Sequence, residues 1–211
     1  MESESHPENR SRSYYFILLG LMIVMKVLDV PLPGVIPGDP LGWIGIFTAP
    51  FRHGDYAHLF SNLLPLILMG WIIHALYGRG LWGALLIIWL SAGGFVYVLA
   101  RESQHIGASG LVYGEAAMLF FTGVFSRQRR YLGISLIIIF LYSGMVAGLL
   151  PVDNHISWES HLYGAIGGVG AAWYYRSRLI SVPVADLGEE DDGEDDDSIS
   201  GGPSVKYTYK E

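Results

Sequence analysis

The chain has 211 residues, of which 51% are hydrophobic and 16% charged, and the apolar residues form long blocks, as in a membrane protein. The net charge of −7 says little about partners, because nine acidic residues lie in one stretch, DLGEEDDGEDDD, from Asp186 to Asp197. The absence of cysteine excludes disulfides, a thiolate nucleophile and a thiolate metal site, so a nucleophile must be a hydroxyl or a carboxylate.

Six apolar segments approach the roughly 20 residues that cross a hydrocarbon layer about 30 Å thick. They are residues 14–30, 56–76, 81–100, 109–125, 131–150 and 158–176. The first follows Arg10 and Arg12, as the apolar part of a signal peptide would, but no small-x-small cleavage site follows it. We therefore interpret it as a retained helix and predict an all-α, polytopic membrane protein with a six-transmembrane-helix bundle.

The parts outside these segments differ in composition. We expect residues 1–13 to be a cytoplasmic N-terminal segment, residues 14–180 the membrane domain, and residues 181–211 an acidic, disordered cytoplasmic tail. The loop PLPGVIPGDPLGWIGIFTAPFRHGDY is rich in proline and glycine but also in aromatic residues. Such a loop is expected to lie partly against the membrane.

Basic residues predict the orientation of the helices. If six helices alternate, Arg52 and Arg101 fall on one side, whereas most arginines fall on the other. The larger group is Arg10, Arg12, Arg79, Arg127, Arg129, Arg130, Arg176 and Arg178. By the positive-inside rule both termini are cytoplasmic, and we expect a multi-pass protein of a prokaryotic cell membrane. The second, fourth and sixth helices then all enter from the outer face.

The first turns of these three helices carry polar residues that a bilayer does not tolerate without a reason. His58 and Asn62 are four residues apart and share one face of the second helix, and Ser109 and Tyr113 do the same on the fourth. His161 lies near the start of the sixth helix. The common direction of the helices brings all five residues to one depth, where we expect them to meet.

The fourth helix also predicts how deep Ser109 lies. From Ser109 to Phe125 it is about 25 Å long, which is shorter than the hydrocarbon layer. Its first residue therefore lies below the outer surface, in a cavity that water reaches. The preceding loop must be shielded by protein, because irregular backbone is tolerated at that depth only away from lipid.

Two pairs of glycines predict that the fourth and sixth helices approach closely. Gly110 and Gly114 form a small-xxx-small pair on the fourth helix, and Gly164 and Gly168 form another on the sixth. Close backbones allow a serine and an imidazole to reach a hydrogen-bond distance of about 2.6–3.2 Å. The pattern indicates an activated nucleophile with its base.

Each of these residues also has a structural interpretation. A serine in a membrane helix commonly bonds to its own backbone, Tyr113 fits core packing, and His161 fits a buried histidine bonded to a neighbouring helix. His58 and Asn62 could serve only to hold helices together. The interpretation as a site rests on all five polar residues together. Residues with unrelated structural roles would not be expected at the same depth on three helices that run in the same direction.

Other ionisable residues are less well placed. Glu159 is two residues from His161 and faces elsewhere on the helix, Asp153 belongs to the preceding loop, and Glu115 is expected to pair inside the protein. Four further histidines are scattered over loops and one helix without a metal-ligand pattern: His53, His74, His105 and His155. We predict no metal, no cofactor and no nucleic-acid partner.

Three ordered motifs resemble the rhomboid intramembrane serine proteases. They are FRHGDYAHLFSN, with Phe51, His53, His58 and Asn62, then GASGLVYG around Ser109, and HLYGAIGG from His161. The resemblance covers roughly Gly45 to Trp173. A GxSG alone is weak evidence, but GxSG with HxxxN upstream and HxxGxxxG downstream is specific.

The resemblance implies a catalytic dyad, with Ser109 as nucleophile and His161 as general base. It also implies that Tyr113 packs against the imidazole, that His58 and Asn62 bind the oxyanion together with the Ser109 N–H, and that Gly107 gives backbone freedom beside the serine. The expected substrates are single-pass transmembrane proteins, cut near the outer membrane face. The loop from Pro151 to Ser157, with the fifth helix, is expected to gate the site.

Some features depart from the family pattern. The tryptophan-arginine pair of the first long loop is missing, His74 stands where bacterial members carry glutamate, and Ser160 replaces a small apolar residue.

A noncatalytic relative that binds transmembrane clients is one alternative function, although such relatives usually lack the serine or the histidine. A transporter is another, but the polar groups stop at one level instead of continuing inward.

Overall fold

The computed structural model describes residues 7–152 and 156–179, and the regular structure within them is helical. Apart from one isolated bridge between Val35 and His105, this part of the chain forms no β-structure. The α-helices are α1 (Pro7–Val27), α2 (Gly45–Thr48), α3 (Tyr56–Tyr77), α4 (Gly80–Leu99), α5 (Ser109–Ser126), α6 (Arg129–Tyr142) and α7 (Trp158–Tyr175). The prediction of an all-α fold is confirmed.

The predicted count of six membrane spans is not confirmed. Within the described residues, four spans are long and apolar enough to cross a bilayer: α3, α4, α5, and the stretch Arg129–Leu149, which joins α6 to the 3-10 helix η3 (Ser143–Leu149). The apolar part of α1, Ser13–Val27, is shorter than the 18 residues required, and α7 is not among the four. Polar residues and four glycines reduce the hydropathy of α7, which packs against α4 and α5.

Several predictions concern residues outside the described ranges. These are the tail from residue 181 onward, the first six residues, Asp153 and His155. The long loop before α3 is partly helical, because it contains α2 between the 3-10 helices η1 (Gly42–Ile44) and η2 (Ala49–Phe51). Its expected contact with the membrane stays a prediction.

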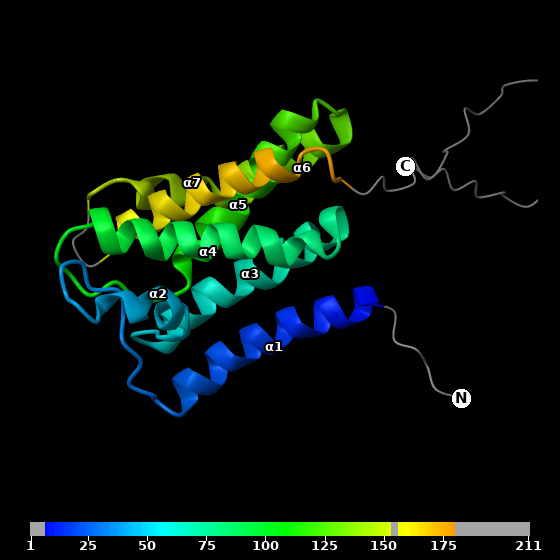
Figure 1. Cartoon of the computed structure of the whole chain (residues 1–211). Coiled ribbons are helices and arrows are strands. Elements are labelled where there is room, and N and C mark those ends of the chain that lie inside the picture. The colour runs from blue at the N-terminus through cyan, green and yellow to red at the C-terminus, as the bar shows by residue number, and fades with distance from the viewer. Residues whose placement is uncertain (1–6, 153–155, 180–211) are drawn as a thin grey trace, which may run out of the picture. The chain divides into compact units, whose positions relative to one another are not determined.

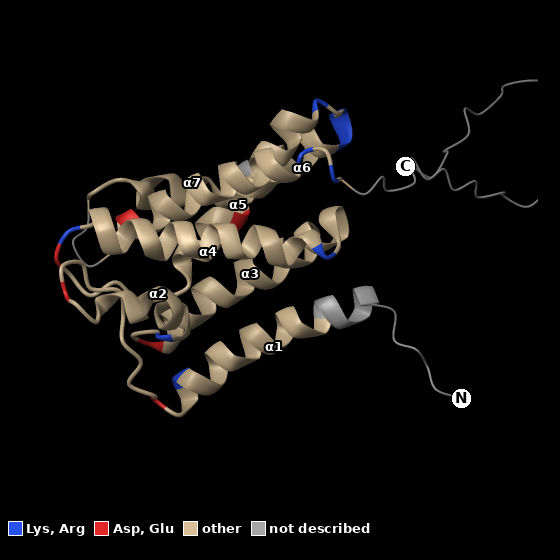
Figure 2. Ribbon diagram, in the orientation of Figure 1, with Lys and Arg blue, Asp and Glu red and all other residues tan. Residues whose placement is uncertain are grey.

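Helix α7 packs against both α4 and α5 (Figure 1). Helix α6 packs against α5, and α1 packs against α3. Lysines and arginines lie at helix ends and in loops (Figure 2). Inside the described bundle, Glu115 of α5 is completely buried, and its Oε1 accepts a hydrogen bond of 2.9 Å from the Tyr15 hydroxyl of α1. The expectation that Glu115 pairs internally is therefore confirmed, and the pair joins α1 to α5.

The predicted close approach of two helices at their glycines is also confirmed. A Cβ atom at Gly164 of α7 would overlap the carbonyl oxygen of Gly110 in α5, and one at Gly168 would overlap that of Gly114. At these positions the obstacle is backbone, which cannot move aside as a side chain does. The lack of a side chain at these two glycines therefore allows the close spacing of α5 and α7.

Local sequence signals set the ends of α3. Asp55 caps its N-terminus, since Asp55 Oδ1 accepts a hydrogen bond of 2.7 Å from the backbone N–H of His58. Gly78, with φ of 54°, ends the helix in a conformation that favours glycine. The cap fixes the first turn of α3, which carries His58, and Asn62 follows one turn later on the same face.

Candidate active site

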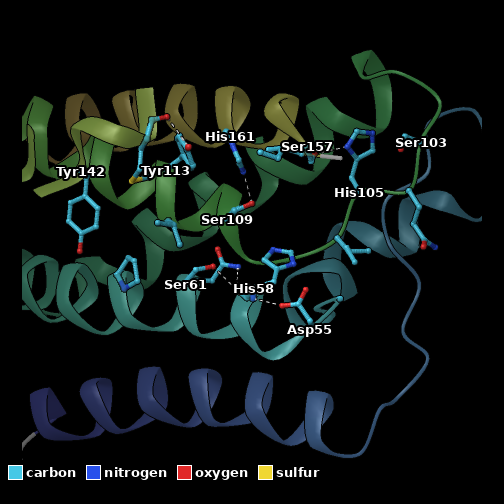
Figure 3. Close-up of a pocket in the computed structure, with 18 of the residues that line it drawn as sticks. Asp55, His58, Ser61, Ser103, His105, Ser109, Tyr113, Tyr142, Ser157 and His161 are labelled. Carbon is cyan, nitrogen blue, oxygen red and sulfur yellow. Dashed lines mark hydrogen bonds between the residues drawn. The ribbon is translucent and has the colours of Figure 1, made fainter. Parts of the chain in front are cut away.

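A serine and a histidine from the ends of two packed helices meet in the structure. Ser109 is the first residue of α5, and His161 lies in the first turn of α7. Ser109 Oγ lies 2.8 Å from His161 Nε2, as Figure 3 shows. This distance is that of a hydrogen bond and suits proton transfer from a hydroxyl to an imidazole.

The contacts of the His161 ring select its tautomer. His161 Nδ1 lies 2.8 Å from the carbonyl oxygen of Gly148 in η3. A carbonyl oxygen only accepts hydrogen bonds, so Nδ1 carries the hydrogen and the Nε2 of a neutral ring is left to accept the Ser109 proton. A backbone carbonyl thus occupies the place that a carboxylate takes in a serine-histidine-aspartate triad.

An aromatic ring fixes the plane of the imidazole. The rings of Tyr113 and His161 are stacked, with centroids 4.0 Å apart and an interplanar angle of 7°. The Tyr113 hydroxyl donates a hydrogen bond of 2.8 Å to the carbonyl of Met145, also in η3. Because η3 holds both the ring nitrogen and the stacked tyrosine, this short segment after α6 orients the histidine.

The backbone before Ser109 is held by contacts with residues at and before the start of α3. Gly107 has φ of 97°, a conformation that L side chains rarely adopt, and a Cβ there would collide with the His58 ring. The N–H of Gly107 donates to the Ala49 carbonyl at 2.9 Å, and the N–H of Ala108 donates to His53 Nε2 at 3.4 Å. Both loop amides are therefore anchored to the segment before α3.

His53 is a buried residue that accepts a hydrogen bond from the loop. Burial lowers the pKa of its imidazole to about 4, and the neighbouring His58, whose ring centroid is 5.0 Å away, acts in the same direction. A neutral ring keeps Nε2 free to accept the Ala108 N–H. His53 belongs to the first of the three sequence motifs, but it was not among the predicted site residues, and no feature of its local sequence indicates this contact.

The second pair of predicted site residues lies on α3, facing α5. Asn62 is buried, with 3% of its surface exposed, and its Nδ2 donates to the backbone carbonyl of His58 at 2.8 Å. That bond uses one of the two amide hydrogens and leaves the other. His58 Nε2 lies against Gly107, so the imidazole is next to the loop that precedes the serine.

All five polar residues line one cavity of about 700 Å³: His58, Asn62, Ser109, Tyr113 and His161. Its wall is polar where the loops before α5 and α7 contribute Arg101, Gln104 and Ser157, and apolar where α6 contributes Tyr142. In Figure 3, Ser109 and His161 point towards each other in this cavity. The cavity is large enough to take a stretch of extended peptide.

Glu159, beside His161 in the sequence, forms an ion pair outside the reacting pair. Glu159, expected to face away from His161, is 2% exposed and pairs with Arg101, whose Nε lies 3.2 Å from Glu159 Oε1. Within the described residues, no group of three or more His, Cys, Asp or Glu side chains could hold a metal ion. Among the described residues, no carboxylate is hydrogen-bonded to His161; the Gly148 carbonyl, which has no sequence signature, takes that position.

Helical spans around a half-buried hydroxyl, a buried imidazole and a buried amide define a polytopic membrane protein with a polar site. Comparison with known proteins shows the family. Residues 40–178 match the model of the Rhomboid domain. The chain therefore belongs to the rhomboid family, and it is a multi-pass membrane protein.

Relatives occur in bacteria and in a plant. Uncharacterized proteins of Mycobacterium tuberculosis and Mycobacterium bovis are 34% identical over 181 residues, which are 78% of this chain and 73% of theirs. The chloroplastic rhomboid-like protein 11 of Arabidopsis thaliana is 31% identical over 155 residues, which are 62% of this chain and 52% of the plant protein.

Proposed function

We propose that the protein is an intramembrane serine endopeptidase, with Ser109 as nucleophile and His161 as general base. The observation that carries the proposal is the 2.8 Å contact between Ser109 Oγ and His161 Nε2, on a ring whose Nδ1 is bound by the Gly148 carbonyl. The reaction needs no cofactor, because a hydroxyl and an imidazole suffice for acyl transfer.

In the first half of the reaction, His161 Nε2 takes the hydroxyl proton as Ser109 Oγ attacks the substrate carbonyl. The same nitrogen then gives that proton to the leaving amine, so an acyl-enzyme remains and the new N-terminus departs. Water that enters the cavity hydrolyses the ester with the roles of acid and base repeated. Stacked Tyr113 keeps the ring in the plane that both transfers require.

The tetrahedral intermediate needs donors for its oxyanion. Ser109 begins α5, and the first N–H groups of a helix have no partner within it. The remaining amide hydrogen of Asn62 and the imidazole of His58 line the same cavity and supply further donors. A donor of this kind typically contributes about 2.7–4 kcal/mol to transition-state stability. Gly107 allows the loop to turn the Ser109 N–H towards the oxyanion.

The substrate class follows from where the site lies. The arginines that flank the helix ends opposite Ser109 favour a cytoplasmic location for those ends, in a prokaryotic cell membrane with both termini inside (Figure 2). These arginines are Arg79, Arg127, Arg129, Arg130 and Arg176. The site then opens near the outer face, where a single-pass substrate unwinds. Segments with helix-weakening residues are favoured, because helix hydrogen bonds keep carbonyls from attack.

A fluorophosphonate probe tests the nucleophile in the intact protein. We expect covalent labelling in detergent micelles, with the phosphonyl adduct located by peptide mass spectrometry on Ser109, because only an activated hydroxyl attacks such a probe at a useful rate. Other serines of the same chain serve as internal controls. An unlabelled Ser109 in folded protein would favour a noncatalytic rhomboid-like protein that binds transmembrane clients.

A further inference from the structure

A set of polar contacts joins the loop before α5 to the start of α7, on the outer side of the proposed dyad. The loop contributes Arg101 and His105, and the α7 end contributes Ser157, Glu159 and Ser160. Figure 3 shows His105 and Ser157 beside each other, at the opposite edge of the cavity from Tyr142. We call this set of five residues the outer seam.

Arg101 connects the loop to two points of the α7 end. Its Nε lies 3.2 Å from Glu159 Oε1, and its Nη2 donates a hydrogen bond of 2.7 Å to the carbonyl of Ile156. Glu159 is almost completely buried, and a buried carboxylate without its cation is strongly destabilised. The ion pair therefore ties the first turn of α7 to the loop in one place.

The other half of the outer seam is a chain of short hydrogen bonds. His105 Nδ1 lies 2.6 Å from Ser157 Oγ, which in turn lies 2.9 Å from Ser160 Oγ. His105 itself is fixed by two backbone hydrogen bonds of 2.9 Å with Val35 and by its Nε2, 3.1 Å from the Arg101 carbonyl. Ser160 departs from the small apolar residue of the family pattern, and its hydroxyl has a use here.

The residues of the outer seam are neighbours of the reacting pair along the chain. His105 is four residues before Ser109, and Ser160 directly precedes His161. Further along the two helices, the stack of Tyr113 on His161 and the glycine contact at Gly164, almost one turn further into α7, also join α5 to α7. Without the outer seam, the first turn of α7 could move relative to the loop while the deeper packing stayed intact.

We propose that Arg101, His105, Glu159 and Ser160 are positioning residues, which hold His161 Nε2 within reach of Ser109 Oγ. This role rests on the proposed function. None of the four touches the reacting atoms; they act through the first turn of α7 and the loop before α5. A displacement of about 1 Å can cost on the order of 10²-fold in rate, so the seam governs turnover more than substrate binding.

Three variants and one control test the outer seam. Arg101→Ala removes both links, Arg101→Lys keeps a cation beside Glu159 but lacks the second donor arm, and Ser160→Ala removes one hydroxyl without a change in packing. Arg52→Ala is the matched control, because Arg52 also donates to a loop carbonyl, that of Leu32, at 2.8 Å, but lies outside the seam. The measurements are kcat and KM on a transmembrane reporter, the fluorophosphonate labelling rate, and the Tm in micelles.

We expect kcat and the labelling rate to fall by about 30- to 100-fold in Arg101→Ala, and KM to stay within about twofold of wild type in Ser160→Ala, because Ser160, unlike Arg101, does not line the cavity. Arg101→Lys should recover part of the loss, and Ser160→Ala, in which folding is least at risk, should lower kcat by at least about threefold with the Tm of wild type. Unchanged kcat and labelling in folded Arg101→Ala and Ser160→Ala would overturn the positioning role alone. Wild-type protein that neither labels nor cleaves would overturn the proposed function and this role together.

Discussion

Replacement of His161 by alanine is expected to lower kcat for cleavage of a transmembrane reporter by at least about 10⁴-fold. The imidazole is the only base within hydrogen-bond distance of Ser109 Oγ among the described residues, and its Nε2 lies 2.8 Å from that oxygen. Without it the hydroxyl keeps its proton, and the leaving amine has no acid. Time courses with the purified variant in proteoliposomes measure the loss.

The control for this variant is another buried histidine. His74 is buried in α3 but does not line the cavity, so His74→Ala tests what the loss of a buried imidazole does to folding alone. We expect His74→Ala to cleave within about tenfold of wild type once equal amounts of folded protein are compared. Cleavage by folded His161→Ala at more than about a hundredth of the wild-type rate would contradict its role as the base.

The second large effect concerns folding: Gly164→Val is expected to lower the free energy of unfolding by about 3 kcal/mol or more. Its Cβ would overlap the Gly110 carbonyl oxygen, so α7 and α5 would have to separate along their whole contact. The same separation would pull His161 away from Ser109. Thermal unfolding in micelles measures the stability, and fluorophosphonate labelling reports the site.

Gly170→Val is the matched control on the same helix, since a Cβ at Gly170 meets nothing within 4 Å. Both variants replace a glycine of α7 by the same β-branched residue, so the difference between them isolates the helix contact. A Tm for Gly164→Val that equals that of Gly170→Val would show that the α5–α7 spacing does not depend on this glycine.

The sequence predicted those parts of the structure that depend on periodicity and residue type. The small-xxx-small pairs indicated where α5 and α7 approach, and the i, i+4 spacing of His58 with Asn62 and of Ser109 with Tyr113 indicated which faces turn inward. Alternation of helix direction then predicted that these residues share one depth. These inferences need only the periodicity of a helix and the rule that successive transmembrane helices alternate in direction.

Other features depend on tertiary contacts that have no local signature. The Gly148 carbonyl binds His161 only because η3 folds over the start of α7, and a backbone atom gives no residue-type signal. The burial of Glu159 depends on Arg101, which is 58 positions away in the sequence. The count of six spans is not confirmed, because the glycines and polar residues of α7 keep it below the hydropathy of the four spans in the described residues, and the apolar part of α1 is shorter than they are.

The most direct test of the account is cleavage of a single-pass reporter by the purified protein in proteoliposomes, beside an equal amount of folded Ser109→Ala. If Ser109 is the nucleophile, wild-type protein alone converts the reporter into two fragments, with the cut near the outer end of the reporter's transmembrane segment. An intact reporter with wild-type protein, or the same two fragments with Ser109→Ala, would contradict it.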